Sequence, residues 1–369
     1  MRRTPATLTT IAERAGVHAS TVSRALSTTP SGIAPATAQR VRAIADELGY
    51  LPDPTAAALR TRRSHVIGVL VPRLTDIVLA VIYEGIDDVA LQSGYQTVVA
   101  NTRDDLALQR TRLETLLARR VDGLILGDAR SDTSLIDDLA ERGIPYVLTS
   151  RRLRGHLSVT TDDLCGGRLA AEHLLSLGHV RLGVIAGEPY ASTGVDRTRG
   201  FLDACLAAGV DIEASRVVHT TFDAVGGRDG AEQLLRLRPR PTALFAVNDF
   251  AAIGAMGAVR AAGLEVGRDI AIVGYNDVSI ATDLPVPLTT IRSPMFQMGQ
   301  EAARMLLERV AGRPVNSQLL TRNWSPARLR CWAPNGPQRR SARPERVRSR
   351  GAAVPGGKCR PFKAPKSWW

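Results

Sequence analysis

The first fifty residues have the apolar spacing of three short helices. One face of the first helix carries residues that recur at intervals of three and four, namely Leu8, Ile11, Ala12 and Ala15. Thr7 precedes this helix as a candidate N-cap, and Gly16 permits a sharp turn after it. Further helices are predicted over 19–27 and 35–48. This arrangement predicts either a helix-turn-helix module or another small three-helix domain that packs on protein.

From residue 67 the pattern changes to short apolar runs that alternate with helical stretches. The predicted strands cover 67–71, 96–100, 123–126, 146–149, 181–186, 243–247 and 270–274. Helices are predicted between them, for example over 83–92, 106–119, 166–177 and 250–262. This alternation predicts an α/β fold with parallel sheets and helices on both faces. Ligands of such sheets bind at the carboxyl ends of the strands.

Positive charge is concentrated at the two ends of the chain. The 369 residues carry a formal net charge of +12. Residues 1–64 hold nine Arg and four acidic residues, and residues 321–369 hold ten Arg, three Lys and one Glu. The stretch between them is mildly acidic. A basic module before an acidic body suggests a polyanionic partner for the module, although a solvated basic face gives the same count.

The sequence offers no constellation for enzymatic chemistry. No glycine-rich phosphate loop follows a predicted strand, and no nucleophile or metal-ligand spacing occurs, so neither a cofactor nor a metal is expected. The four Cys show no paired spacing, and the N-terminus has no apolar signal core. No apolar run reaches the ~18 residues of a membrane helix. These features predict a cytoplasmic protein with no membrane partner.

The first helices closely resemble a known DNA-binding headpiece. Residues 15–17 read Ala-Gly-Val, residues 20–24 read Ser-Thr-Val-Ser-Arg, and residues 47–52 read Glu-Leu-Gly-Tyr-Leu-Pro. These motifs resemble those of the lactose/galactose-repressor (LacI-type) family of bacterial transcriptional regulators. The resemblance implies that residues 1–52 form a helix-turn-helix headpiece. The residues expected to contact DNA in it are Thr7, Ala19, Ser20, Thr21, Ser23 and Arg24.

Within this headpiece the second helix carries the residues that would read DNA. Ala19 and Ser20 match the family positions that reach base edges, and Arg24 can donate two hydrogen bonds to a guanine. His18 and Ala34 stand where the family usually has a serine N-cap. Each is therefore expected to weaken the start of its helix by about 1 kcal/mol.

Residues 53–64 match the hinge helix of the family, which folds on DNA. Leu59 matches a leucine that enters the minor groove, and Arg60 is placed to meet a phosphate. Asp53 stands where the family usually has Asn, and a carboxylate near DNA is unfavourable. A flexible linker is the plain alternative for this segment.

The resemblance continues through residues 65–320. Typical motifs are Gly-His-Val-Arg-Leu-Gly-Val-Ile-Ala-Gly at 178–187, Ala-Val-Asn-Asp at 246–249 and Val-Gly-Tyr-Asn-Asp at 273–277. They imply a periplasmic-binding-protein-like body of two doubly wound parallel-sheet subdomains with a cleft between them. The N-subdomain would comprise about 65–160 and 291–320, and the C-subdomain about 161–290. The chain would cross between them near 160, 291 and 320.

A small-molecule effector is expected in this cleft. The residues implied to bind it are Thr75, Leu79, Ser150, Arg197, Phe222, Asn248 and Asn276. Two alternatives stay open: Arg197 as a salt-bridging surface residue, and Asn248 as the cap of the helix that follows it. Ser150 and Asn276 each replace an Asp that is common in the family, whereas Arg197 is kept. This balance favours a neutral or acidic ligand, such as a sugar or sugar acid.

Residues 321–369 differ in composition from the rest of the chain. All three Lys and all four Trp lie there. Codons for Thr-Arg-Asn-Trp-Ser-Pro-Ala-Arg at 321–328 can also be read two bases later as Pro-Glu-Leu-Val-Ala-Arg-Ala, which resembles the final strand of the family. We expect residues from about 321 onward to be out of frame. The alternative is a genuine basic, disordered tail that binds nucleic acid or an acidic surface.

These features together predict a sequence-specific transcriptional regulator, specifically a repressor. A homodimer would bind a pseudo-palindromic double-stranded operator, and an effector in the cleft would change its affinity for DNA. One alternative is a solute-binding protein of the same body fold without DNA regulation, and another is an α/β enzyme. The basic headpiece argues against the first, and the lack of a catalytic constellation argues against the second.

Overall fold

The computed structural model describes residues 6–26, 32–50 and 63–320. The predicted hinge contacts Leu59 and Arg60 lie outside the described residues, as do most of the predicted hinge and all of the predicted tail, 321–369. The chain divides into two compact units, Met1–Ser64 and His65–Trp369.

Three helices form the first unit: α1 (Leu8–Ala15), α2 (Ala19–Ala25) and α3 (Pro35–Glu47). Their apolar faces meet in a small core in which Ile11, Val22 and Val41 are fully buried. Gly16 ends α1 with a φ of 62°, a left-handed conformation that glycine adopts without strain. The predicted helix-turn-helix is therefore present.

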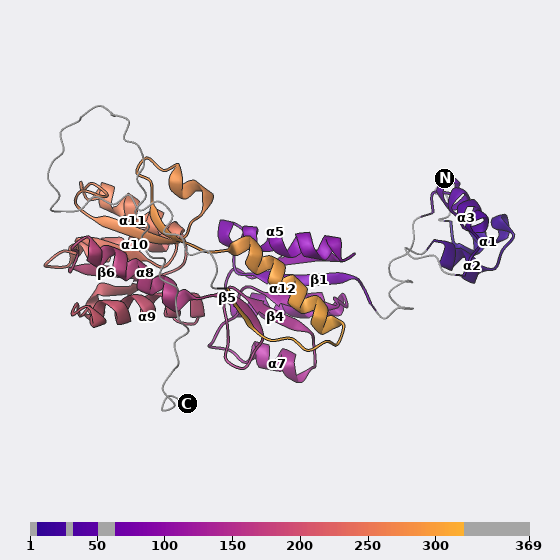
Figure 1. Cartoon of the computed structure of the whole chain (residues 1–369), viewed down its shortest axis with the longest axis horizontal. Helices are drawn as coiled ribbons and strands as arrows, with labels where there is room; N and C mark the ends of the chain where they lie inside the picture. The colour runs from indigo at the N-terminus through magenta and orange to yellow at the C-terminus, as the bar shows by residue number, and fades with distance from the viewer. Residues whose placement is uncertain (1–5, 27–31, 51–62, 321–369) are drawn as a thin grey trace, which may run out of the picture. The chain divides into compact units, whose positions relative to one another are not determined.

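The second unit begins with a six-stranded sheet in the order β11-β5-β4-β3-β1-β2, in which every pair is parallel. Its strands are β1 (Val66–Val71), β2 (Gln96–Asn101), β3 (Gly123–Leu126), β4 (Tyr146–Thr149), β5 (Ser158–Thr161) and β11 (Gln318–Leu320). Its helices are α5 (Ile77–Gln92), α6 (Leu106–Ala118), α7 (Leu135–Glu141) and α12 (Met295–Val310). Helices α5 and α12 lie side by side (Figure 1), whereas α6 and α7 bury their apolar side chains in a separate cluster on the sheet.

A five-stranded parallel sheet follows, in the order β10-β9-β8-β6-β7. Its strands are β6 (Leu182–Ala186), β7 (Val217–His219), β8 (Ala243–Ala246), β9 (Ala271–Asn276) and β10 (Thr289–Arg292). Helices α10 (Ala224–Arg236) and α11 (Asp249–Ala261) cover one face, and α8 (Asp163–Ser176) and α9 (Ser192–Ala207) cover the other (Figure 1). Short 3-10 turns occur at Ala214–Arg216 and Ser279–Thr282.

The chain passes between the two sheets twice within the described residues. Strand β5 belongs to the six-stranded sheet and leads into α8, which packs on the five-stranded sheet. Strand β10 belongs to the five-stranded sheet and leads into α12, which packs on the first sheet. The described residues end with β11 at residue 320. The predicted α/β class with two parallel sheets is confirmed.

Close helix crossings place the side chains of the cleft. A Cβ at Gly167 on α8 would lie 2.0 Å from the Arg197 carbonyl oxygen, and a Cβ at Gly200 on α9 would lie 2.0 Å from that of Leu164. Only glycine permits this approach, so α9 sits directly against α8. The side chain of Arg197 is thereby held beside the start of α8. Within the part of the chain that the structure describes, no helix is both long and apolar enough to cross a membrane.

Candidate functional site

The recognition face of the first unit is the outer side of α2. Ser20 and Arg24 are exposed there, and Thr21 and Ser23 are half-buried, whereas Val22 and Ala25 point into the core. Ala19 is half-buried, and Thr7 is exposed at the start of α1. All the predicted DNA contacts that lie among the described residues are thus at least partly accessible to a partner.

Side chains cap the first two helices. The Thr7 hydroxyl accepts a hydrogen bond from the Thr10 backbone N–H at 3.2 Å. At α2, the His18 ring nitrogen Nδ1 accepts from the Ser20 backbone N–H at 3.3 Å and lies 2.9 Å from the Ser20 hydroxyl oxygen. His18 therefore supplies a side-chain cap to α2 where the family usually has serine, and the expected weakening of this helix start stays a prediction. Ala34 gives α3 no side-chain cap, as expected.

A cleft in the second unit is lined by residues at the carboxyl ends of strands from both sheets. Its walls are formed by Pro72, Asp76, Val78, Leu79, Gly127, Ser150, Arg151, Thr193, Arg197, Phe222, Asn248 and Asn276. The first seven follow β1, β3 and β4 of the six-stranded sheet. The others follow strands of the five-stranded sheet, except Asn276, which is the last residue of β9. This is the place at which parallel sheets bind ligands.

Arg197 is the buried anchor of the cleft. Its side chain is 6% exposed, and its Nε donates to Asp163 Oδ1 at 2.8 Å. Its Nη1 donates to the Val247 carbonyl oxygen at 2.8 Å, and the guanidinium stacks over the Tyr275 ring at 3.8 Å. Among the described residues Nη2 has no hydrogen-bond partner. Arg197 does form a salt bridge, but as a buried residue of the cleft wall and not as a surface residue.

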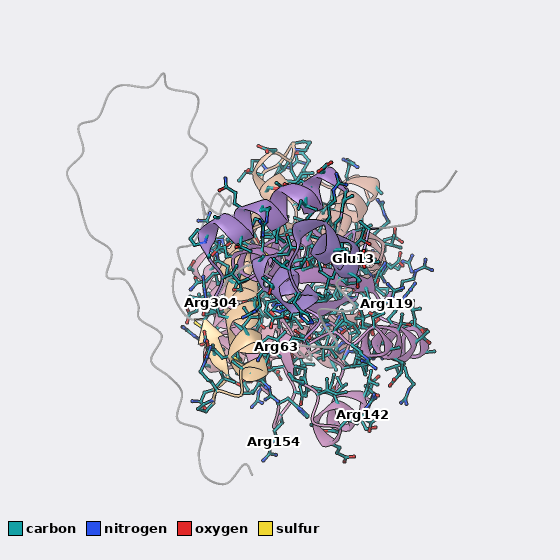
Figure 2. All side chains as sticks on the ribbon, turned by 90° about the vertical axis from the view of Figure 1, so that its right-hand side faces the viewer. Glu13, Arg63, Arg119, Arg142, Arg154 and Arg304 are labelled. Carbon is teal, nitrogen blue, oxygen red and sulfur yellow. The ribbon has the colours of Figure 1, made fainter. Side chains whose placement is uncertain are left out.

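Arg151 is held from the opposite wall. Its guanidinium donates two hydrogen bonds of 2.8 Å to the two carboxylate oxygens of Asp104. Such a bidentate pair fixes the plane of the guanidinium and balances its charge. By contrast, Arg142 and Arg154 lie at the surface of the same unit (Figure 2). Both arginines that line the cleft are thus paired with a protein carboxylate.

Asn248 combines a structural role with a place in the cleft wall. Its Oδ1 accepts from the Ala251 N–H at 2.8 Å, which caps α11, and its Nδ2 donates to the Phe222 carbonyl oxygen at 2.7 Å. The cap expected as an alternative is therefore present. The bond to Phe222 also holds the loop whose aromatic ring packs against Gly187, where a Cβ would lie 2.2 Å from the ring.

Two strand ends in the cleft have left-handed backbone conformations. Ser150 has a φ of 64° and Asn276 a φ of 110°. Residues other than glycine seldom adopt such angles, and this kind of strain concentrates at binding sites. Asn276 Oδ1 is buried and has no hydrogen-bond partner among the described residues. It is an acceptor that a ligand donor in the cleft can satisfy.

Asp76 adds a carboxyl group that the sequence reasoning overlooked. It caps α5 by accepting from the Val78 N–H at 2.9 Å. Burial raises the pKa of Asp76 above its usual range, against the lowering effects of that hydrogen bond and of the Arg197 and Arg151 guanidinium groups. The charges around the cleft thus comprise two balanced ion pairs and one acid whose ionisation is disfavoured.

Polar contacts join the two halves of the second unit across the cleft. The Arg152 guanidinium binds the Asp196 carboxylate at 2.8 Å, and the Arg152 backbone N–H donates to Ser192 Oγ at 2.8 Å. The Arg130 guanidinium lies over the Tyr190 ring at 3.4 Å. A further ion pair joins Arg73 to Asp223 at 3.4 Å. These contacts connect the loops that follow strands of the six-stranded sheet to the loops and to the first turns of α9 that follow strands of the five-stranded sheet.

The structure brings together all the predicted effector residues except one. Leu79, Ser150, Arg197, Phe222, Asn248 and Asn276 line the cleft, whereas Thr75 is exposed and does not. The neighbouring Asp76 takes its place because it turns inward to cap α5. Sequence reasoning missed Pro72, Asp76, Val78, Gly127, Arg151 and Thr193. Pro72 directly follows a predicted strand and Arg151 lies close after another, so the strand-end rule alone pointed to both.

Comparison with known proteins agrees with this architecture. The family described as "Bacterial regulatory proteins, lacI family" matches residues 7–53, and the "Periplasmic binding protein-like domain" matches residues 171–324. The HTH-type transcriptional repressor PurR of Photobacterium profundum is 32% identical over 308 residues, covering 83% of this chain and 92% of the relative. The chain belongs to the lacI family of bacterial regulatory proteins. The predicted family, its periplasmic-binding-protein-like body and its role as a DNA-binding transcriptional regulator are confirmed.

Two solved structures of this family are similar over most of the chain. A lac repressor dimer bound to operator and the anti-inducer ONPF has a TM-score of 0.78 and 31% identity, covering 86% of this chain and 97% of its own. A complex of the regulator CelR with cellobiose has a TM-score of 0.65 and 31% identity, covering 86% and 96%.

Proposed function

We propose that this lacI-family regulator is a repressor that acts in the cytoplasm as a homodimer. The two headpieces of the dimer bind the half-sites of a pseudo-palindromic operator, because a two-fold protein matches a two-fold site. The DNA contacts are Thr7, Ala19, Ser20, Thr21, Ser23 and Arg24, together with Leu59 and Arg60 of the hinge. The exposed outer face of α2 supports this assignment.

The effector is a neutral sugar bound in the cleft of the body. Arg197 and Arg151 already pair with Asp163 and Asp104, so neither adds an unbalanced positive charge that would attract an acid. Ionisation of Asp76 would add negative charge. The cleft also presents Arg197 Nη2 and the oxygen of Asn276, a donor and an acceptor suited to neighbouring hydroxyl groups.

The observation that carries this proposal is the arrangement of Arg197, Phe222, Asn248 and Asn276 around one cleft. Aromatic and polar groups of this kind bind the apolar faces and hydroxyl groups of sugars. The relative CelR is known in complex with cellobiose, which supports the same ligand class here. Ligand binding would change the balance between conformations of the body and so the affinity of the headpieces for DNA.

A thermal-shift panel tests the ligand class. Neutral sugars, including cellobiose, glucose, galactose and ribose, are compared with gluconate and glucuronate at equal concentration. We expect at least one neutral sugar to raise the melting temperature, because a ligand that binds only the folded state stabilises it. Stabilisation by the acids alone would refute the proposed class.

Gel-shift or anisotropy measurements test DNA binding. The full chain is titrated against the DNA upstream of its own gene and against a scrambled duplex of the same length. We expect sequence-selective binding that weakens with salt. The variant Arg24→Ala should lose affinity for the upstream DNA, whereas Arg119→Ala, which changes an exposed arginine of the body, should not. Equal binding to both duplexes would refute the proposal.

A further inference from the structure

The residue that caps α2 also touches a residue proposed to read a base. His18 Nδ1 lies 3.3 Å from the Ser20 backbone nitrogen and 2.9 Å from Ser20 Oγ. A backbone N–H can only donate a hydrogen bond, so Nδ1 must be the unprotonated acceptor. The neutral ring therefore carries its hydrogen on Nε2.

This tautomer fixes the direction of the Ser20 hydroxyl group. A hydroxyl has one hydrogen and two lone pairs. Since Nδ1 is an acceptor, the hydrogen of Ser20 points toward His18, and only lone pairs face away from the ring. Ser20 is exposed, so a base edge would meet an acceptor at this position.

We propose that His18 sets the hydrogen-bond polarity of Ser20 and thereby its base preference. This inference rests on the proposed function, in which Ser20 reaches a base edge in the major groove. An acceptor at Ser20 selects the amino group of adenine or cytosine. The direction of the Ser20 hydroxyl group alone sets this preference, with no change in the backbone of α2.

Protonation of His18 reverses that polarity. When Nδ1 takes one proton from solvent, the ring donates to Ser20 Oγ and releases the hydroxyl hydrogen. Ser20 can then donate to the acceptors of guanine or thymine. The Ser20 backbone N–H loses its cap at the same time, and a positive charge appears at the positive end of the helix. Total affinity and base preference therefore both change.

The His18 ring lies at the protein surface, where it can exchange a proton with solvent. His18 is exposed to solvent. The charged groups on the elements around it are Glu13 and Arg14 of α1, Arg24 of α2, and Arg40, Arg42, Asp46 and Glu47 of α3. Arg14 pairs with Glu47 at 2.5 Å, and Arg24 and Arg42 donate to backbone carbonyl groups. Among the described residues no carboxylate pairs with the His18 ring.

Selection from a randomised duplex library tests the proposal. The full chain is used at about pH 8 and about pH 5.5. At one position of the enriched half-site we expect adenine or cytosine at the higher pH. The ratio of these bases to guanine or thymine should fall roughly five- to ten-fold at the lower pH. Duplexes that differ only at this position then give the same ratio by anisotropy.

Three variants separate this effect from a merely structural one. His18→Ser keeps a cap but cannot titrate, so its base preference should be the same at both pH values. Ser20→Ala should lose the preference at this position alone. Arg40→Ala, which changes an exposed charge of the same headpiece, should keep the wild-type shift with pH.

The inference is overturned if the wild-type preference is unchanged by pH, or if His18→Ser shows the same change. It is also overturned if guanine or thymine is preferred at the higher pH. Failure of the proposed function looks different, because no sequence would then be enriched at either pH. Circular dichroism at both pH values checks that each variant retains its helices.

Discussion

Replacement of Arg197 by methionine removes the best-connected side chain of the cleft. The variant loses the ion pair to Asp163 at 2.8 Å and the hydrogen bond to the Val247 carbonyl group. The Asp163 side chain, which is only 5% exposed, is then left without a neighbouring cation. Removing one partner of a buried ion pair destabilises a protein by roughly 3–5 kcal/mol. For a domain of this size, each 1 kcal/mol lowers the melting temperature by about 2–4 °C. We therefore expect a fall of roughly 6–20 °C.

Arg199 provides a matched control on the same helix. It pairs with Asp203 at 3.5 Å, and the two side chains are 69% and 67% exposed. Exposed pairs one helical turn apart contribute about 0.5 kcal/mol or less. Arg199→Met should therefore shift the melting temperature by no more than about 2 °C. In the Arg197→Met background, Asp163→Asn should recover most of the lost stability because it removes the unpaired charge.

Differential scanning fluorimetry measures all four proteins with and without the sugar that stabilises the wild type most. Arg197→Met should melt early and show no sugar-induced shift, whereas Arg199→Met should retain the full shift. Equal melting temperatures for the two single variants would refute the structural part of the reasoning. An undiminished sugar shift in folded Arg197→Met would refute the ligand-binding part.

Three further results are expected. Burial raises the pKa of Asp249 to about 7, so this group favours the folded state below about pH 4 and loses that contribution as the pH rises through about 7. The free energy of unfolding of the wild type relative to Asp249→Asn, obtained from thermal unfolding curves, should rise between about pH 8 and 5 by up to ~1.4 kcal/mol per pH unit, and parallel curves would contradict this. Arg152→Ala breaks a contact across the cleft and should weaken sugar binding in calorimetry by up to about five-fold, so unchanged affinity counts against a role in closure. Sequencing across codon 320, with an intact mass, should reveal a frame error, and an unbroken frame would exclude one.

The strands that could be predicted are those whose own residues are apolar. The runs at 67–71, 123–126 and 146–149 correspond to β1, β3 and β4 within one residue at each end. Strand β5 was missed because it reads Ser-Val-Thr-Thr, and it is buried only through its place in the sheet. Strands β7 and β11 are three residues long and lie at sheet edges. These short segments are strands only because they pair with a neighbouring strand, and the local sequence pattern carries no information about that pairing.

Residues of the candidate site could be predicted where a polar residue suited to ligand binding lies at the end of a predicted strand. Asn248 and Asn276 satisfy that condition, and both line the cleft. The pairing of Arg197 with Asp163 was not predictable, because it depends on a glycine-mediated crossing of α8 and α9 and joins residues 34 positions apart in the chain. Likewise, the choice between Thr75 and Asp76 depends on which side chain caps α5, and sequence spacing does not decide that.

The most direct test measures the coupling between the DNA-binding headpiece and the sugar-binding cleft in one titration. The affinity of the full chain for its upstream DNA is measured by anisotropy, with and without the sugar that gives the largest thermal shift. We expect this sugar to change the affinity for the upstream duplex by at least about five-fold and to leave binding to a scrambled duplex unchanged. A sugar that stabilises the body but leaves the affinity for the upstream duplex the same would contradict this expectation.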